Sequence, residues 1–425
     1  MTSQVQYHLV ETPEQFSRAA AALAEGRGAY AIDTERAASF RYDDRAFLVQ
    51  IYRRDTDTYL FAPEGNRDAL HDALAPVING EDWIIHAAVD DLKSLAMLGL
   101  YPGTIFDTEL ASRFAGFNRP NLAAMVQHFV GVELKKGHGH EDWSTTPLPP
   151  TWQEYAALDV AHLHDLAEAL AEQLDNEGKL SFAEQEFERI VNELGPDNAP
   201  FNETWRDMKG VSGLRSARSL QLAKTLWTAR DEHCRKEDIS PGHMLSSESI
   251  VTIARTVPSS PWELRNCLRY RSLNTTKAKF WFSLVEQALA EDPEQWPTPA
   301  QPAPTDPPAK IVWEHDYPRS WHALQSARKY VSEVAAQQNI RPDMLLSSAV
   351  LRQVMWTAPD SDAVWSTDAA AMQLKRAGAR PWQIALTAPL LARAQAEAKA
   401  AGIPQGKTPS SGRAAARRRR RKRAQ

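Results

Sequence analysis

The stretch that decides the fold is Ala29-Tyr30-Ala31-Ile32-Asp33-Thr34-Glu35, an apolar run that ends in two carboxylates. Because side chains alternate across a strand, Asp33 and Glu35 are expected on the same face. Two anions on one half-buried face repel each other, and a divalent cation held by oxygen ligands would offset that repulsion. A solvated strand edge would explain the same pair without a metal. Acids elsewhere in the chain decide between these interpretations.

The composition indicates a folded protein with an acidic body and a basic end. Its 425 residues suffice for two to four domains, and 43% hydrophobic with 24% charged residues is ordinary for globular proteins. Residues 413–425 hold eight Lys or Arg and no acid, which leaves 41 bases against 54 acids, or −13, in residues 1–412. The two cysteines lack metal-type spacing, and neither a secretory start nor an apolar run of about 18 residues occurs. We therefore expect a cytoplasmic protein without membrane contact.

Strand and helix patterns alternate over the first 200 residues, which predicts an α/β domain with a mixed sheet. Residues 7–10 read as a strand, after which Thr12 caps a helix that has Gln15 three residues beyond the cap. Residues 46–52 and 58–61 flank a short turn, which predicts an antiparallel run beside the first stretch.

Further acids follow at the starts and on the faces of predicted helices. Asp90 and Asp91 fall in the first turn of a helix after the short strand at 83–86, where the helix dipole favours negative charge with or without a metal. Tyr155 and Asp159 are four residues apart on a helical pattern and share one face. Asp159 has apolar neighbours, a costly place for an unpaired anion.

Together the segments read Asp33-x-Glu35, His86-x4-Asp91 and Tyr155-x3-Asp159. This set resembles the three exonuclease motifs of the DEDD superfamily in its tyrosine subtype, and residues 5–205 resemble ribonuclease D. The resemblance implies an RNase H-like exonuclease domain over residues 1–204. The family spacing His-x4-Asp-Leu selects Asp91 rather than Asp90, which then serves as a helix-cap residue.

The resemblance implies a catalytic set formed by Asp33, Glu35, Asp91, Tyr155 and Asp159, whose four carboxylates would be the metal ligands. Two Mg²⁺ or Mn²⁺ ions roughly 3.5–4 Å apart can activate water and stabilise the leaving oxygen of a phosphodiester, and such hard cations prefer carboxylate oxygens. Asp33 would bridge both ions. Tyr155 would position the water, because a tyrosine with an ordinary pKa near about 10 is a poor base at neutral pH.

Residues near these acids are candidates for contacts with nucleic acid. His86 would lie at a strand end close to the substrate. Lys135 and Lys136 belong with His138-Gly139-His140 to a loop that we expect to be flexible and to face the substrate. Arg36 departs from the family pattern, in which an apolar residue commonly follows the glutamate, and this puts in doubt how the terminal nucleotide stacks there.

The C-terminal half repeats at a constant offset of 101 residues, as Ile239-Ser240-Pro241 and Ile340-Arg341-Pro342 illustrate. The first copy, residues 205–291, resembles the HRDC domain shared by helicases and ribonuclease D, and the second, residues 319–401, resembles a diverged version. The sequence thus predicts two all-α HRDC-like domains. Residues 292–318 hold eight prolines and are expected to form an extended linker, and residues 402–425 a disordered basic tail.

Basic residues of the C-terminal half would contact phosphates. In the first copy these candidates alternate with aromatic side chains that could stack on bases, although we expect Phe280 and Trp281 to be core residues. The tail would tether a polyanion in a salt-sensitive way, unless it serves solubility or adheres to the acidic body. The predicted nucleic-acid contacts of this half are Arg265, Arg269, Lys277, Arg417, Arg418, Arg419, Arg420 and Arg421.

The resemblance implies a metal-dependent 3′–5′ exoribonuclease that removes 5′-mononucleotides from single-stranded RNA 3′ ends, with precursors of tRNA and other stable RNAs as substrates. A 3′–5′ DNA exonuclease is the alternative among enzymes, because such a metal site does not by itself distinguish the two sugars. A catalytically silent RNA-binding scaffold is the alternative outside enzymes. The complete set of four acids and one tyrosine argues against the scaffold.

Overall fold

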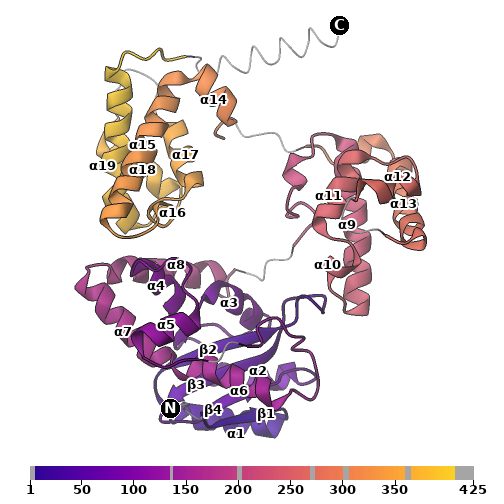
Figure 1. Cartoon of the computed structure of the whole chain (residues 1–425), viewed down its shortest axis with the longest axis vertical. Helices are drawn as coiled ribbons and strands as arrows, with labels where there is room; N and C mark the ends of the chain where they lie inside the picture. The colour runs from indigo at the N-terminus through magenta and orange to yellow at the C-terminus, as the bar shows by residue number, and fades with distance from the viewer. Residues whose placement is uncertain are drawn as a thin grey trace. The chain divides into compact units, whose positions relative to one another are not determined.

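The computed structural model of the chain describes residues 5–134, 137–198, 203–268, 273–299, 306–358 and 365–406. Its contacts divide the chain into two compact units. The first comprises Met1–Thr104, Leu134–Leu163 and Val191–Gln301, and the second comprises Ile105–Glu133, His164–Ile190 and Pro302–Gln425. Each unit combines part of the predicted N-terminal domain with one helical copy. Figure 1 colours the chain by residue number, from the strands and helices of the N-terminal half to the two helical copies. The predicted domain boundaries stay a prediction.

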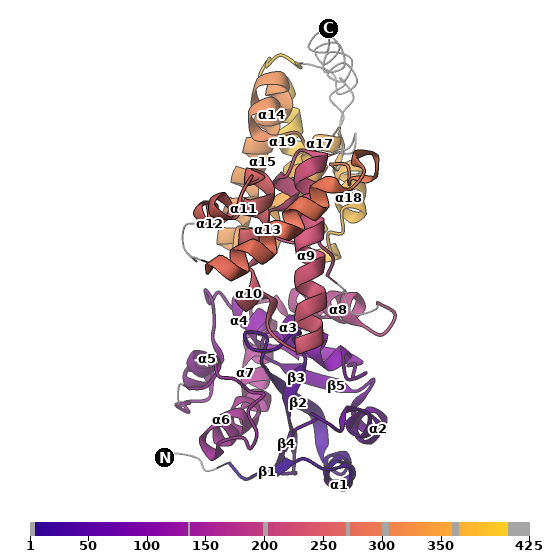
Figure 2. The same cartoon turned by 90° about the vertical axis from the view of Figure 1, so that its right-hand side faces the viewer.

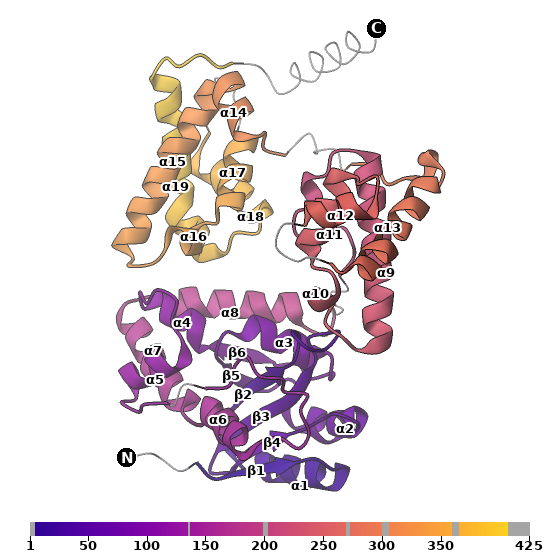
Figure 3. The ribbon, with the colours of Figure 1, turned by 45° about the vertical axis from the view of Figure 1, so that its right-hand side comes forward.

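A six-stranded sheet carries the stretch that decides the fold near its centre (Figure 3). Its strands are β1 (Tyr7–Val10), β2 (Arg27–Arg36), β3 (Ala46–Arg54), β4 (Thr58–Phe61), β5 (Asp82–Ile85) and β6 (Thr104–Asp107), in the spatial order β1-β4-β3-β2-β5-β6. β2 pairs antiparallel with β3, and β3 with β4, whereas the pairs β1–β4 and β2–β5 are parallel. The predicted mixed sheet is confirmed.

β2 brings the first two acids to one face of the sheet. Its apolar part is fully covered, because Ala31 and Ile32 are 0% exposed. Asp33 lies opposite Gln50 in the β2–β3 ladder, and Glu35 lies opposite Leu48. Residues two apart on a strand share a face with their cross-strand partners, so the predicted orientation of the acid pair follows from this register.

Four helices of the first unit flank this sheet: α1 (Pro13–Ala24), α2 (Arg67–Ile78), α3 (Ala88–Ala96) and α6 (Pro150–Ala161). The predicted cap of α1 is confirmed, since the Thr12 hydroxyl accepts from the Gln15 N–H and the Gln15 side chain accepts from the Thr12 N–H. α6 lies on one side of the sheet, and α1 and α2 pack together on the other (Figure 2). α6 contacts β2, β3 and β4, which places its side chains near the acids of β2.

The remaining helices of the N-terminal half are α4 (Thr108–Phe114), α5 (Leu122–Phe129), α7 (Leu163–Asn176) and α8 (Leu180–Leu194). They belong to the second unit, apart from the first residue of α7 and residues 191–194 at the end of α8. The buried ammonium of Lys179 donates to the Phe114 carbonyl over 3.0 Å, and the rings of Phe106 and Phe187 pack with their centroids 5.2 Å apart. Aromatic packing and a paired buried cation therefore hold this group of helices together.

The first helical copy is built from η1 (Val211–Gly213), α9 (Ala217–Glu237), α10 (Pro241–Met244), α11 (Ser247–Thr256), α12 (Pro261–Cys267) and α13 (Thr275–Ala290), followed by η2 (Pro293–Gln295). Trp281 is 1% exposed in its core, as predicted. The prediction that Phe280 is a core residue is wrong, because its side chain is 47% exposed. Consecutive helical residues point about 100° apart, so α13 buries one of the two rings and exposes the other.

The second helical copy repeats these elements as α15 (Pro318–Gln337), α16 (Pro342–Leu345), α17 (Ser348–Thr357), α18 (Thr367–Arg376) and α19 (Pro381–Ala400). α15, α16 and α17 begin 101 residues after α9, α10 and α11, which is the offset read from the sequence. α18 and α19 begin 106 residues after α12 and α13. The second copy thus has five more residues between its third and fourth helices than the first copy has.

The extended conformation predicted for the proline-rich stretch is wrong for residues 310–316, which form α14 (Lys310–Asp316). Trp313 is 0% exposed, its ring contacts that of Trp356 at 5.2 Å, and its Nε1–H donates to the Ser320 hydroxyl. Burial of this indole outweighs the extended tendency of the prolines that precede the helix. Among the described helices, none has both the length and the apolarity that crossing a bilayer requires.

Candidate active site

Three segments that are distant in the sequence place four acids and one tyrosine in the same part of the first unit. β2 carries Asp33 and Glu35, α3 carries Asp91, and α6 carries Tyr155 and Asp159. Carboxylate oxygens of Asp33, Glu35 and Asp159 all lie within 4.8 Å of one another. The sequence motifs therefore converge in space, as their resemblance to exonuclease motifs implies.

Asp91 is held beside this group by β2 itself. Its Oδ1 accepts a hydrogen bond of 2.6 Å from the hydroxyl of Thr34, and its side chain is buried. The same hydroxyl lies 3.1 Å from that of Ser94. The neighbouring Asp90 is exposed and pairs with Lys93 at 3.5 Å, so its environment is that of a surface residue at a helix start. This difference in burial supports the choice of Asp91 in the second motif.

Burial and mutual repulsion raise the pKa of every acid in the group. Burial is the larger cause for Asp33, whose pKa rises to about 7, and for Glu35, whose pKa rises to about 10; the charges of neighbouring carboxylates add to both. The pKa of Asp91 is raised well above its usual value by burial and by the charge of Asp33. Burial also raises the pKa of Asp159 to about 7, although the Tyr155 hydroxyl donates to it. Such clustered, perturbed acids are typical of functional sites.

The donor set fits a divalent metal. Carboxylate oxygens are the ligands that Mg²⁺ and Mn²⁺ prefer, and three of them within 4.8 Å can surround one cation. A cation there would also offset the repulsion that raises these pKa values, because it would bind the ionised forms. The residues present therefore fit divalent-metal dependence.

Tyr155 is positioned from two sides. Its hydroxyl donates to the carboxylate of Asp159, one turn further along α6. Its ring meets that of His138 edge-on at 5.7 Å and lies 6.4 Å from that of Trp143. The indole N–H of Trp143 donates to the His138 carbonyl, so residues 138–143 form a packed segment against the tyrosine. Sequence reasoning missed this packing, because it treated the His138-Gly139-His140 stretch as a flexible loop.

Arg36 brings a positive charge to the edge of the acid group. It follows Glu35 on β2, and its guanidinium lies 3.6 Å from Asp44 and 3.9 Å from Asp91. Its charge counteracts the rise in the pKa of Asp33, Glu35 and Asp91. Gln50, opposite Asp33, is 0% exposed, and neither atom of its amide has a hydrogen-bond partner among the described residues.

The predicted nucleic-acid contacts are only partly described by the structure. His86 is half-buried directly after β5, Arg265 is half-buried on α12 with its guanidinium donating to Thr275, and Lys277 is exposed on α13. Trp262 is 72% exposed on the same copy. Outside the described residues lie Lys135, Lys136, Arg269, Arg417, Arg418, Arg419, Arg420 and Arg421.

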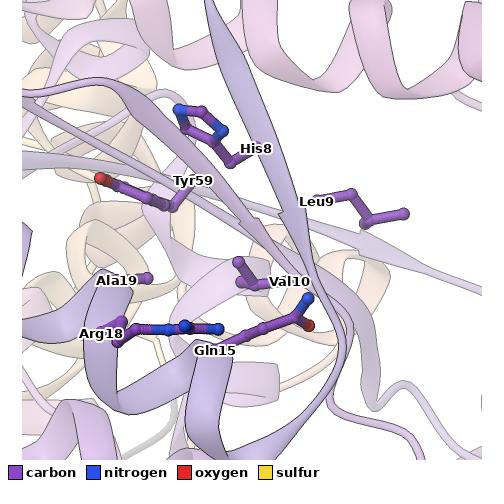
Figure 4. Close-up of a pocket in the computed structure, with 7 residues that line it drawn as sticks. All are labelled: His8, Leu9, Val10, Gln15, Arg18, Ala19 and Tyr59. Atoms are coloured by element: carbon purple, nitrogen blue, oxygen red, sulfur yellow. The ribbon is translucent and has the colours of Figure 1, made fainter.

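A separate pocket of about 290 Å³ opens at the β1 edge of the sheet (Figure 4). It is lined by His8, Leu9, Val10, Gln15, Arg18, Ala19 and Tyr59. The imidazole of His8 stacks on Tyr59 with centroids 5.5 Å apart and contacts the carboxylate of Asp57 at 2.8 Å. None of the five motif residues lines this pocket, so it is distinct from the acid group.

Three family models match separate ranges of the chain. A model described as a 3′–5′ exonuclease matches residues 7–175, and the HRDC domain model matches residues 219–277. A third model, described as the C-terminal domain of a 3′ to 5′ exonuclease, matches residues 306–395. This third match covers most of the second helical copy, so the likeness of that copy to HRDC rests on its helix order.

Similar proteins extend over most of the chain. Ribonuclease D of Bartonella henselae is 28% identical to this chain, over 59% of this chain and 60% of its own length. Ribonuclease D of Escherichia coli is 25% identical, over 82% of this chain and 90% of its own length. A solved protein structure from Bifidobacterium adolescentis is 30% identical and superimposes with a TM-score of 0.75 over 92% of this chain and 97% of its own. The E. coli ribonuclease D structure shares the fold, with a TM-score of 0.67 at 22% identity over 92% of this chain and 99% of its own.

The fold, the acid group and the matched models define a 3′–5′ exonuclease domain followed by helical accessory domains. Within that class, relatives named ribonuclease D are similar in sequence over 59% and 82% of this chain. The chain thus resembles the ribonuclease D family over most of its length.

Proposed function

We propose that this protein is a divalent-metal-dependent 3′–5′ exoribonuclease that removes 5′-mononucleotides singly from RNA 3′ ends. The observation that carries the proposal is the meeting of Asp33, Glu35 and Asp159 within 4.8 Å, with Asp91 and Tyr155 beside them. Exonuclease chemistry requires such a set of hard oxygen ligands next to a group that can position water.

The names of the relatives favour RNA over DNA as the substrate. They are called ribonuclease D, and the E. coli protein is described as an exoribonuclease involved in structured RNA processing. We extend that substrate class to this chain and propose precursors of tRNA and other stable RNAs, processed in the cytoplasm. The free 3′ end of a single-stranded RNA would be the first part of the substrate to reach the acid group.

Each side chain has a distinct role in the proposed mechanism. Asp33, Glu35 and Asp159 would hold one divalent ion, and Asp33 with Asp91 would hold a second, with Mg²⁺ or Mn²⁺ as the metal. When bound, such ions lower the pKa of water and stabilise charge on the attacking and leaving oxygens. The hydrogen bond from Thr34 to Asp91 fixes one of these carboxylates before any ion arrives.

Tyr155 would act by position and not by removing a proton. Burial raises its pKa above the ordinary tyrosine value, and the charges of Asp159, Glu35 and Asp33 raise it further. The hydroxyl therefore keeps its proton at neutral pH and donates to Asp159. In that state it can hold an attacking water by accepting a hydrogen bond while it fixes the carboxylate.

A labelled-RNA assay with an Asp33→Asn variant and chelator controls tests the proposal. The wild-type protein should release labelled 5′-mononucleotide at once from 3′-labelled RNA and shorten 5′-labelled RNA stepwise, with Mg²⁺ or Mn²⁺ and not with chelator. Asp33→Asn should lower the rate at least about 10³-fold, because several kcal/mol of transition-state stabilisation would be lost. RNA binding by the variant should persist.

Asp90→Asn is the matched control, since Asp90 is an exposed acid next to the site that pairs with Lys93. This variant should degrade RNA at the wild-type rate. Equal degradation of DNA would favour the DNA exonuclease instead. If no mononucleotide appears with either metal, a non-catalytic RNA-binding scaffold becomes the better description.

A further inference from the structure

Gln50 is a buried polar residue that the proposed mechanism does not use. It lies on β3, its side chain is 0% exposed, and neither its amide oxygen nor its amide nitrogen has a hydrogen-bond partner among the described residues. A buried amide without partners costs folding free energy, whereas an apolar side chain of similar size would not carry that cost. Such a group in a protein interior therefore requires an explanation.

The register of the sheet places this amide beside the acid group. Gln50 lies directly opposite Asp33 in the antiparallel β2–β3 ladder and directly opposite Leu60 in the antiparallel β3–β4 ladder. Side chains at directly opposite positions share one face of a sheet, with their Cβ atoms roughly 4.5–5.5 Å apart. The Gln50 side chain therefore lies on the face that carries Asp33 and Glu35, between Asp33 and the apolar Leu60.

Gln50 lies deeper in the protein than the acid that it faces. Its neighbour Leu60 packs with Ala156 and Ala157 of α6 in one apolar cluster, and all three are 0% exposed. Asp33, in contrast, is only half-buried. A substrate can therefore reach Asp33 and not Gln50, so Gln50 can influence a reaction at the acid group only through a neighbouring side chain.

Asp33 is the neighbour that can use the amide. Its carboxylate accepts from the backbone N–H of Thr34, and the oxygens of an ionised carboxylate offer about four acceptor sites in all. The NH₂ group of Gln50 supplies N–H donors that no other described residue occupies. Leu60, on the other side of Gln50, has no polar side-chain atom that could compete for these donors.

We propose that Gln50 is a positioning residue for Asp33, whose ionised carboxylate accepts from the Gln50 amide and is thereby held in the orientation that the reaction needs. This inference rests on the proposed function, in which Asp33 is a metal ligand. Hydrogen bonds to a ligating carboxylate orient it, and loss of such a partner typically lowers metal affinity or activity about 10- to 100-fold. A polar side chain is therefore useful at this buried position although it costs folding free energy in the metal-free protein.

The variant Gln50→Met tests this inference, because methionine is similarly long and unbranched but cannot donate a hydrogen bond. The dissociation constant for Mn²⁺, measured by titration calorimetry of the full-length protein, should rise about tenfold or more. RNA turnover should fall by a similar factor while the KM for RNA stays unchanged, since Gln50 does not touch the substrate. The melting temperature of the metal-free protein should stay equal or rise, because a buried amide without partners is removed.

Leu60→Met is the matched control, because it introduces the same residue next to Gln50, on the same face of the sheet and at an equally buried position. This variant removes no hydrogen-bond donor and should keep the wild-type Mn²⁺ affinity and turnover. Equal losses in both variants would show a general effect of repacking this face and would overturn a role specific to the Gln50 amide.

A purely structural role for Gln50 predicts the opposite result for stability. If Gln50→Met lowers the metal-free melting temperature or fails to fold, the amide stabilises the fold itself and the inference is overturned. Absence of Mn²⁺ binding and of mononucleotide release in the wild-type protein would contradict the proposed function, and the inference with it. Wild-type binding and release that Gln50→Met retains in full would instead leave the proposed function intact and remove only the role of Gln50.

Discussion

Two charged clusters in the first unit have opposite electrostatics. In the acid group, Asp33 and Asp159 stand among like charges, and the pKa of each rises to about 7. Around Arg45, opposite charges meet: its guanidinium lies 2.8 Å from both Asp43 and Asp238. Hydrogen bonds from Arg45 hold the pKa of Asp238 below its usual value.

The Arg45 cluster contains charges that stabilise the fold, whereas the acid group contains charges that serve chemistry. The Arg45 cluster joins the loop after β2 to the end of α9, and a hydrogen bond of 2.7 Å from Tyr42 to Asp231 supports the same junction. Every charge in it has a partner of opposite sign. In the acid group Arg36 alone among the described residues offsets part of the repulsion among four acids, and buried repulsion of that kind costs folding free energy unless a ligand offsets it. A cluster whose charges are only partly compensated is therefore the stronger indication of function.

The largest expected effect comes from removing one negative charge from the acid group. Asp159→Asn should lower exonuclease turnover at least about 10³-fold, because a metal ligand is lost. The same change should leave the melting temperature of the metal-free protein unchanged or higher, since repulsion from Asp33 and Asp91 is relieved. Paired kinetic and calorimetric measurements check both expectations. A large loss of metal-free stability would show that this acid is structural, and the contrast between clusters would fail.

A smaller effect is expected from pH. Asp33 and Asp159 have folded-state pKa values of about 7, above their usual value near about 4, so the folded metal-free protein binds more protons between these limits. Its stability should therefore fall as the pH rises from 5 to 8. A divalent ion binds the ionised carboxylates, so the increase in melting temperature caused by Mg²⁺ should grow over the same range. Thermal scans with Mg²⁺ and with chelator measure this; an increment that shrinks toward pH 8 would contradict the prediction.

The smallest effect is expected at the Arg45 cluster. Asp238→Ala should lower the free energy of unfolding by less than about 1 kcal/mol, because the pair is partly solvated and screened by salt. The Asp238 pKa is lowered in the folded state, so this contribution is present above the unfolded value near about 4 and is lost as the pH falls through the folded value. Urea titrations at pH 7 and pH 3 measure the difference. Exonuclease turnover should change little, and a loss as large as that of Asp159→Asn would make this cluster catalytic.

Much of the architecture follows from local sequence patterns. The spacing of Asp33 and Glu35 set one face of a strand, and Thr12 with Gln15 set a helix start, because both depend on residues only a few positions apart. The repeat at an offset of 101 residues could also be read from the sequence, since copies of one helical unit keep their helix lengths. The change of this offset to 106 residues after α17 could not be read in the same way, because five additional residues do not alter the helical periodicity.

The details of the site depended on contacts between distant segments. No local pattern shows that Thr34 binds Asp91, that Arg36 stands between Asp44 and Asp91, or that the His138 segment packs on Tyr155. The errors at Phe280 and at α14 have the same origin, since exposure and helix formation there depended on which distant surface was available.

The sequence by itself determined which residues carry the acids and the order in which strands and helices present them, because motif spacing and periodicity are local properties. Only the tertiary structure decided that three carboxylates meet within 4.8 Å while Asp91 is held by a hydroxyl and faced by a guanidinium. The physical reason is that charge, burial and pKa depend on distances through space, which the packing of β2, α3 and α6 sets.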